Sequence, residues 1–365
     1  MPDHSDRLAR LRRRLRGRSM YVSALPNIRY LTGFTGSAGH LLVAPDETKL
    51  FTDGRYRLQA SEQTQGIDVE IASGDSRPAL VKRVVALRLR RLSFEANRLD
   101  YDTYAFLDGS LPICRLDPLR SVVETMRMRK SPAEIEAIRR SVELNSKAFE
   151  DVCARIGPGW TESLVAAELE FAMRRLGAEG AAFPTIVASG THGALPHAEP
   201  RARQLREKSL VVVDQGAILD GYCSDMTRMI ALGHPDETQT KLFHAVLEAQ
   251  VAAIDAICPG VECRTVDNRA RQGLRMTTVE GIRLDTKFSH STGHGVGLEI
   301  HEGPRVAPRQ RRRLETGMVV TVEPGVYLEG LAGARIEDVV VVTETGCEVL
   351  TRTSRELRVL QGPGR

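Results

Sequence analysis

The chain has 365 residues, of which 42% are hydrophobic and 27% are charged, and this length exceeds one ordinary hydrophobic core, so we expect two domains. The 51 basic and 47 acidic residues leave a net charge of only +4, which argues against a nucleic-acid partner, and no apolar run approaches a membrane span. Six cysteines without a CxxC pair, and no apolar core of a secretory signal, predict reduced thiols in a cytoplasmic protein.

The first third of the chain predicts a small α/β domain. Leu8, Leu11 and Leu15 recur at helical spacing between arginines, which predicts an amphipathic first helix with a solvated basic face. The Gly/Thr-rich stretch 27–39 is predicted to be a loop. Strands are predicted over 20–22, 40–44, 49–52 and 91–95, and helices over 56–63 and 78–89. Because strands alternate with helices, we expect a mostly parallel or mixed sheet.

A boundary is predicted between one domain of 1–127 and another of 128–365. Ser131, Pro132 and Glu134 form a helix start, with serine as the N-cap and glutamate three residues later. Helices are predicted from there to about 156, from 161 to 176, from about 236 to 257 and from about 265 to 279. Strands are predicted over 183–189, 210–213, 222–232, 318–324, 326–329, 334–343 and 348–351. The second domain therefore repeats a plan of two helices followed by strands.

Two aspartates lie on the predicted hairpin of 210–232. If Asp220 and Gly221 form a two-residue turn, Asp214 pairs with Thr227, and Asp225 shares that face. The two carboxylates would be diagonal neighbours with backbones roughly 7–8 Å apart. Two anions at the edge of an apolar core require either protonation or a cation between them. The simpler interpretation of this hairpin alone is two solvated turn aspartates.

Three histidines, His290, His294 and His301, occur close together in HSTGHGVGLEIHE. The HxxxH spacing is that of helical zinc sites, but glycines flank His294 and disfavour a helix. We therefore expect an extended or looped segment. Lone histidines are more often structural than ligating, whereas this clustering favours a site.

Further carboxylates follow at Glu323, which ends an apolar strand, and at Glu337, which is expected to share a strand face with Arg335. Each alone could be a strand-end residue with an arginine partner. Four carboxylates and one imidazole together suit two divalent cations, and oxygen ligands favour Mn²⁺, with Co²⁺ or Zn²⁺ as alternatives. Two such ions can share a bridging hydroxide and polarise a carbonyl, while a nearby carboxylate moves the proton. This chemistry is that of a hydrolase.

The motifs DQGAILDGYCSDMTR, HSTGHGVGLEIHE, VVTVEPGVY and ARIEDVV together resemble those of the pita-bread metallopeptidases, family M24, in the branch of Xaa-Pro aminopeptidases and prolidases. NIRYLTGFTGSAG and FTDGRY are similar to the creatinase-type N-terminal domain of that branch. The resemblance implies an α+β protein, with a C-terminal pita-bread (creatinase/aminopeptidase) fold and a smaller α/β creatinase-like N-terminal domain. It also implies a homodimer.

The resemblance implies five metal ligands: Asp214, Asp225, His294, Glu323 and Glu337. Asp214 would chelate one ion, Asp225 and Glu337 would bridge both, and the other two would complete the second. Catalytic roles are implied for Glu323 in relaying a proton, and for His197 and His301 beside the substrate carbonyl. Supporting positions are implied at His290, Tyr327 and Arg335.

An Xaa-Pro bond lacks the amide N–H that many peptidases use to align a substrate. A site that grips the free amino group and polarises the carbonyl does not need it. We therefore expect an Xaa-Pro aminopeptidase, a dinuclear-metal exopeptidase acting on peptides with proline second. The alternative is an Xaa-Pro dipeptidase, for which Arg305 could bind the terminal carboxylate, unless it is simply a surface arginine. A non-catalytic peptidase-like binding module is the remote alternative.

Overall fold

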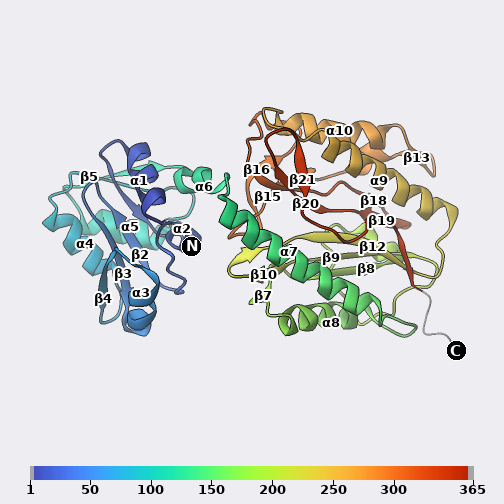
Figure 1. The fold of residues 1–365 in the computed structure, drawn as a ribbon, viewed down its shortest axis with the longest axis horizontal. Coiled ribbons are helices and arrows are strands. Elements are labelled where there is room, and N and C mark those ends of the chain that lie inside the picture. Colours follow the sequence, from blue (N-terminus) through green and yellow to red (C-terminus); the bar gives the residue numbers. More distant parts are fainter. Residues whose placement is uncertain (1–3, 361–365) are drawn as a thin grey trace. The chain divides into compact units, whose positions relative to one another are not determined.

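The structure is a computed structural model that describes residues 4–360. The chain forms two compact units, unit 1 (Met1–Arg127) and unit 2 (Met128–Arg365), which follow one another from blue to red in Figure 1. Within the described residues, no helix has the length and apolar character needed to cross a bilayer.

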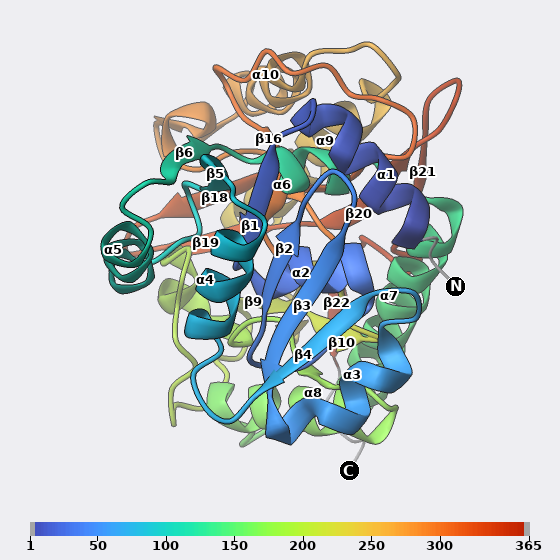
Figure 2. The same cartoon turned by 90° about the vertical axis from the view of Figure 1, so that its left-hand side faces the viewer.

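Unit 1 is built around one six-stranded sheet with the order β4-β3-β2-β1-β5-β6. Strand β2 runs antiparallel to β1 and β3, whereas the outer neighbours pair in parallel, so the predicted mixed sheet is confirmed. Figure 2 shows β2, β3 and β4 side by side. The elements are α1 His4–Leu15, β1 Ser19–Val22, α2 Leu25–Thr32, β2 His40–Val43, β3 Thr48–Asp53, η1 Gly54–Tyr56, α3 Arg57–Gln63, β4 Asp68–Ala72, α4 Arg77–Ala86, β5 Arg91–Glu95, α5 Tyr101–Ser110, β6 Arg115–Leu119 and α6 Val122–Arg127.

The prediction of a loop over 27–39 is wrong for its first part, which lies in helix α2. Proline at the start of α2 and Gly33 at its end, with φ of 83°, mark the two ends of the helix. Ile28, Tyr30 and Leu31 are buried, and this tertiary packing stabilises a short helix that local propensity alone does not predict. The amphipathic first helix is confirmed, because all three of its leucines are buried.

Unit 2 contains two helix pairs, α7–α8 and α9–α10, and a long β-hairpin follows each pair, as the repeated plan predicts. The capping box expected at the start of α7 is present. Helix α10 stops before the predicted end at 279, because the next residues form the tight hairpin β13–β14. The elements are α7 Pro132–Cys153, α8 Glu162–Arg175, β7 Gly180–Ala181, β8 Ile186–Ser189, η2 Gly190–Ala194, β9 Leu210–Gln215, β10 Ala217–Leu219, β11 Tyr222–Cys223, β12 Met226–Leu232, α9 Glu237–Asp255, α10 Cys263–Arg275, β13 Thr278–Val279, β14 Ile282–Arg283, η3 Leu284–Lys287, β15 Gly293–Gly295, β16 Glu302–Val306, β17 Val319–Val322, β18 Gly325–Leu328, β19 Ala332–Arg335, β20 Asp338–Val342, β21 Cys347–Val349 and β22 Arg358–Leu360.

The first hairpin of unit 2, residues 210–232, has the predicted register. Strands β9 and β12 pair antiparallel with Asp214 opposite Thr227, and β10 and β11 pair directly on either side of a two-residue turn. Asp220 and Gly221 form that turn with φ of 51° and 75°, and a type I′ geometry of this kind matches the twist of the strands. The turn chemistry therefore sets which strand positions face each other.

The second hairpin, residues 319–342, is broken in its middle. Strand β17 pairs with β20 and β18 pairs with β19, but the two pairs belong to different sheets. The single strand predicted over 334–343 is therefore wrong, because the chain leaves one sheet after Arg335 and enters another at Asp338. Glu323 and Glu337 occupy opposing positions on the two strands of the hairpin, within this break.

Other segments bind the backbone at this break. The Glu337 N–H donates to Thr227 O in the first hairpin at 3.1 Å, and the Glu323 N–H donates to Thr292 O at 2.7 Å. These hydrogen bonds satisfy backbone donors that a continuous ladder would otherwise satisfy. The bond of Glu337 also ties the second hairpin to the first, and the bond of Glu323 ties it to the segment that carries His294.

Strand β9 is buried on both faces, because helices pack on either side of its sheet, as Figure 1 shows for α8 and α9. Val211 and Val213 pack in one core with α7 and α8, and Leu210 and Val212 pack in another with α9 and α10. Side chains alternate along a strand, so Asp214 points to the same side as Leu210 and Val212. The packing of the strand thus directs this carboxylate toward the second hairpin.

Candidate metal centre

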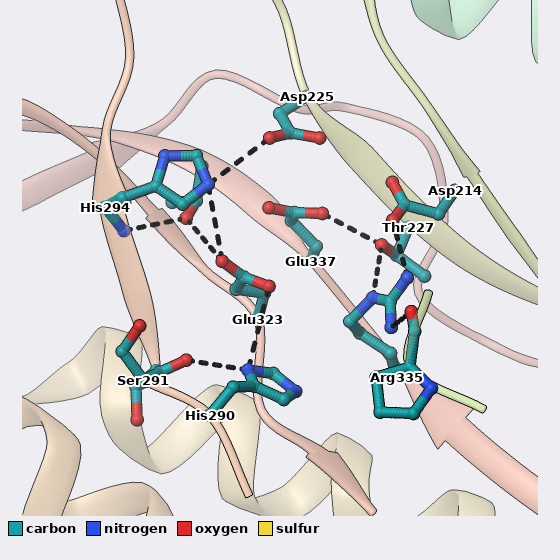
Figure 3. A network of polar contacts seen from close by, with 12 residues as sticks. Asp214, Asp225, Thr227, His290, Ser291, His294, Glu323, Arg335 and Glu337 are labelled. Atoms are coloured by element: carbon teal, nitrogen blue, oxygen red, sulfur yellow. Dashed lines mark hydrogen bonds and ion pairs between the residues drawn. The ribbon is translucent and has the colours of Figure 1, made fainter. Parts of the chain in front are cut away.

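All five predicted metal ligands lie together in unit 2 (Figure 3). Asp214 is in β9, Asp225 directly precedes β12, and His294 is in β15. Glu323 and Glu337 come from the break in the second hairpin. Four of the five side chains are buried, and Glu323 is half-buried.

Three of these residues offer donor atoms within 4.8 Å of one another: Asp225, His294 and Glu337. His294 Nε2 lies 3.5 Å from Asp225 Oδ2 and 3.4 Å from Glu323 Oε1. One nitrogen and several carboxylate oxygens therefore converge on one small volume.

The tautomer of His294 follows from its other nitrogen. Nδ1 lies 3.0 Å from the carbonyl oxygen of Gly295, which can only accept, so Nδ1 carries the hydrogen and donates. Burial lowers the pKa of His294 to about 4, which leaves the imidazole neutral at physiological pH. The Nε2 lone pair then faces carboxyl oxygens of Asp225 and Glu323, an arrangement that is repulsive unless a cation or a carboxyl proton lies between them.

Three carboxyl groups of the cluster, those of Asp225, Glu323 and Glu337, resist ionisation. Burial raises the pKa of Asp225 well above its usual range, and Asp214 and Glu323 raise it further. Burial also raises the pKa of Glu337 well above its usual range, with Asp225 as the next cause. Burial raises the pKa of Glu323 to about 7, against the opposing effect of Arg335. Bound cations would reverse this effect by stabilising the ionised forms.

Asp214 differs from the other three carboxylates, because a guanidinium faces it. Arg335 Nη2 donates to Asp214 Oδ2 at 2.5 Å. The same guanidinium donates to Tyr327 Oη at 2.6 Å and to Thr227 Oγ1 at 3.2 Å. A single guanidinium still leaves excess negative charge when all four carboxylates are ionised.

The residues present fit divalent cations. Within residues 4–360, Asp214 Oδ1 and Glu337 Oε1 are buried and have no hydrogen-bond partner. Leaving a buried anionic oxygen unsatisfied costs several kcal/mol, so native proteins pair or ligate such atoms. Coordination would satisfy both oxygens and the Nε2 lone pair of His294, and a donor set of this kind suits hard or borderline divalent ions.

The predicted substrate-side histidines lie beside the cluster. The rings of His294 and His301 meet edge to face, with their centroids 4.4 Å apart. Burial lowers the pKa of His301, and electrostatic interactions with His197 and Arg305 lower it further. His197 follows Pro196, whose carbonyl oxygen accepts a hydrogen bond from Arg335 Nη1 at 3.2 Å.

The predicted supporting residues form a relay of hydrogen bonds. Arg335 donates to Tyr327 Oη, whose hydroxyl lies 3.0 Å from His290 Nε2. His290 Nδ1 lies 2.8 Å from Ser291 O and therefore donates to it, which leaves Nε2 to accept from the tyrosine. Burial lowers the pKa of His290 to about 4, in keeping with a neutral ring.

Comparison with known proteins identifies the family. The model of metallopeptidase family M24 matches residues 136–344, and the model of the creatinase/prolidase N-terminal domain matches residues 7–129. The chain belongs to metallopeptidase family M24. The pita-bread fold and the creatinase-like N-terminal domain predicted from the motifs are confirmed.

Relatives and solved structures extend this finding to nearly the whole chain. The Xaa-Pro dipeptidase of Pyrococcus furiosus is 34% identical over 93% of this chain and 94% of its own length. The structure of the Xaa-Pro dipeptidase from Bacillus anthracis has a TM-score of 0.94 at 36% identity, covering 98% of this chain and 100% of that one. The X-Pro aminopeptidase from Thermotoga maritima MSB8 has a TM-score of 0.89 at 36% identity, covering 96% and 100%.

Two buried aspartates that were not predicted from the sequence hold ligand segments of this M24 metallopeptidase. Asp267 in α10 accepts from the N–H and the hydroxyl of Thr292, at 3.2 and 2.9 Å, two residues before His294. Asp338 accepts from Arg228 at 2.6 Å and from Gln250 at 2.7 Å, directly after Glu337. Asp338 could have been predicted, because it directly follows the predicted ligand Glu337. Asp267 could not, because nothing in its neighbouring sequence distinguishes it from other polar residues of its helix.

A third missed residue, Glu162, holds the segment that carries His197. Its carboxylate accepts from the N–H of Ser189 at 2.8 Å and from the N–H of Arg201 at 3.1 Å, on either side of that segment. His192 Nδ1 lies 2.9 Å from the same carboxylate. A glutamate at a helix start normally indicates only favourable helix electrostatics, so its sequence position does not reveal this contact.

Proposed function

We propose that this M24 metallopeptidase is an Xaa-Pro dipeptidase, a prolidase that cleaves a dipeptide before its C-terminal proline. Arg305 carries this proposal: its side chain is exposed, and within residues 4–360 no carboxylate forms an ion pair with it. It is close enough to His294 and His301 to lower the pKa of both. A dipeptide has a carboxylate directly beyond the scissile bond, and a guanidinium binds a carboxylate through two parallel hydrogen bonds.

The named relatives support the same choice, because the relatives from P. furiosus and B. anthracis are Xaa-Pro dipeptidases. The T. maritima protein is described as an X-Pro aminopeptidase, and its structure matches at the same 36% identity as the B. anthracis structure. Xaa-Pro aminopeptidase activity, predicted first from the motifs, is therefore the second candidate.

Divalent cations held by Asp214, Asp225, His294, Glu323 and Glu337 would supply a Lewis acid for the carbonyl and lower the pKa of a water molecule. Glu323 accepts a proton and returns it to the leaving proline nitrogen, a task suited to a carboxyl whose pKa is not fixed far below neutrality. His197 and His301 donate hydrogen bonds to the carbonyl oxygen as negative charge develops there. Arg305 orients the substrate through its terminal carboxylate.

We also propose that the site prefers Mn²⁺, because four carboxylates outnumber the one imidazole and no cysteine belongs to the cluster. Metal-stripped protein is expected to regain hydrolysis of Ala-Pro most fully with Mn²⁺, when Mn²⁺, Co²⁺ and Zn²⁺ are compared at equal occupancy. Greater activity with Zn²⁺ at that occupancy would contradict the assignment.

The decisive experiment compares Ala-Pro with Ala-Pro-Ala in the Mn²⁺-loaded enzyme and in two variants. We expect preferential cleavage of Ala-Pro, and Arg305→Gln should raise its KM by about tenfold or more, because an ion-paired hydrogen bond to the carboxylate is lost. The matched control is Arg309→Gln, which removes an exposed charge from the same segment and should leave KM unchanged.

Efficient removal of alanine from Ala-Pro-Ala, with the Arg305 variant affecting both substrates equally, would establish the aminopeptidase instead. If neither substrate is cleaved with any of the three metal ions, both peptidase proposals fail.

A further inference from the structure

Unit 1 has a pocket between helix α1 and the segment that joins β6 to α6. It has a volume of about 720 Å³. Five arginines line it together with uncharged residues: Arg10, Arg13, Arg14, Arg16 and Arg120. Among the described residues 4–360, none that lines this basic pocket is acidic, so these walls carry a formal charge of +5.

Other arginines of α1 have structural partners, which makes the contrast informative. Arg7 Nη1 donates to Tyr30 O at 2.8 Å, and Arg12 Nε donates to Ala44 O at 2.9 Å. These two side chains bind backbone carbonyls and hold the helix on its unit. Arg7 and Arg12 therefore have a structural role in α1, and neither of them lines the basic pocket.

The pocket arginines lack comparable partners. Arg14, Arg16 and Arg120 form no ion pair within residues 4–360. Arg10 and Arg13 both reach only the exposed carboxylate of Asp6, at 3.9 Å. Exposed pairs at this distance contribute at most about 1 kcal/mol, so most of the charge in the pocket is uncompensated.

The spacing of these arginines is unfavourable for the helix itself. Arg10 and Arg14 are four residues apart and Arg10 and Arg13 are three apart, so they are neighbours on one helical face. Like charges at these spacings destabilise a helix. Binding an anion would convert this repulsion into attraction.

We propose that the basic pocket binds a small soluble anion carrying several phosphate groups. Guanidinium groups match phosphate oxygens through paired hydrogen bonds, and five of them around one pocket suit an anion of several charges. The pocket is open to solvent, and its volume of about 720 Å³ leaves room for such an anion.

The lining disfavours two macromolecular partners. In the part of the chain that the structure describes, no aromatic side chain lines the pocket, whereas single-stranded nucleic acids are bound through bases stacked on aromatic rings. Val122 is the one lining residue with a large apolar side chain, whereas a membrane-binding surface inserts an extended apolar face. A compact oligophosphate needs neither feature.

The test is calorimetric titration of the Mn²⁺-loaded full-length protein with inorganic tripolyphosphate at low ionic strength, where charge screening is weak. Three proteins are compared: the natural sequence, the double variant Arg14→Gln/Arg120→Gln, and the control Lys82→Gln/Arg90→Gln. The control removes the same charge from exposed positions elsewhere in unit 1. Tripolyphosphate chelates Mn²⁺ equally in all three, so the difference between them isolates the pocket.

We expect saturable binding to one site, weakened about tenfold or more in the pocket variant and nearly unchanged in the control. Peptidase activity equal to that of the natural sequence would show that each variant is folded, and the single variant Arg14→Gln replaces the double one if that fails. Absence of saturable binding, or equal weakening in both double variants, would overturn the proposal. So would tighter, pocket-dependent binding of a single-stranded oligonucleotide or of phosphatidylserine vesicles in parallel titrations.

Discussion

The two hairpins of unit 2 supply the same kind of side chain in different ways. In the first, Asp214 stands inside a regular ladder opposite Thr227, so strand alternation directs its carboxylate, and only Asp225 stands where the chain passes from the sheet of β11 to the sheet of β12. In the second, Glu323 and Glu337 stand in a break where the chain changes sheets, and hydrogen bonds to other segments fix their backbones. A regular ladder can place one carboxylate on a face, whereas the close approach of several anions also requires an interrupted one.

Each hairpin also donates a hydrogen bond to a carboxylate of the other, but the two donors differ in charge. Arg335 of the second hairpin donates to Asp214 of the first, and Thr227 of the first donates to Glu337 of the second at 2.8 Å. Asp214 thus receives a charged donor, whereas Glu337 receives a neutral hydroxyl. The comparison predicts that Glu337 depends on bound cations and that Asp214 depends on Arg335.

The largest expected effect is that of Glu337→Gln, which removes a ligand charge from the second hairpin. We expect kcat/KM for Ala-Pro to fall at least about a thousandfold, since removing a residue that merely supports a ligand already costs about 10–100-fold. Metal content by mass spectrometry should fall in parallel. The metal-free variant should nevertheless melt higher than the metal-free natural protein at pH 8, because a glutamine neither buries a negative charge beside other carboxylates nor has to take up a proton on folding. A lower melting temperature would show that Glu337 is a structural residue instead.

A second prediction concerns Arg335→Gln, which leaves Asp214 of the first hairpin buried without its cation. Breaking a buried ion pair costs about 3–5 kcal/mol, and urea unfolding of the metal-free protein should show a loss of that size. The matched change is Arg139→Gln, which breaks the surface pair with Glu348 and should cost at most about 1 kcal/mol. Similar losses in the two variants would mean that the buried pair contributes no more than the exposed one.

The smallest expected effect is the pH dependence of the metal-free protein. Burial raises the pKa of Glu323 from 4.5 to about 7, so the folded state holds a proton that the unfolded state has released between these pH values. The lowered pKa values of His290 and His294 act in the opposite direction below pH 6.5. Stability of the metal-free protein should therefore fall clearly only as pH rises above that value, where the raised pKa values of Asp225 and Glu337 act in the same direction as that of Glu323, by on the order of 1–3 kcal/mol. With Mn²⁺ the slope should be absent or reversed, because ligands must be deprotonated to bind the ion. Thermal unfolding with and without a chelator measures both slopes, and a metal-free protein that gains stability as pH rises above 6.5 would contradict this assignment.

Local features of the sequence determined the register of the first hairpin, because a two-residue turn at Asp220 and Gly221 allows only one pairing. The motifs also determined the family and the set of ligand candidates, because coordination requires particular residue types. Tertiary structure alone decided the break at Glu323 and Glu337, since a change of sheet depends on partner strands from distant parts of the chain. It also decided which arginines of α1 bind backbone carbonyls and which line a pocket. Both outcomes depend on long-range packing, which turn chemistry and side-chain periodicity do not encode.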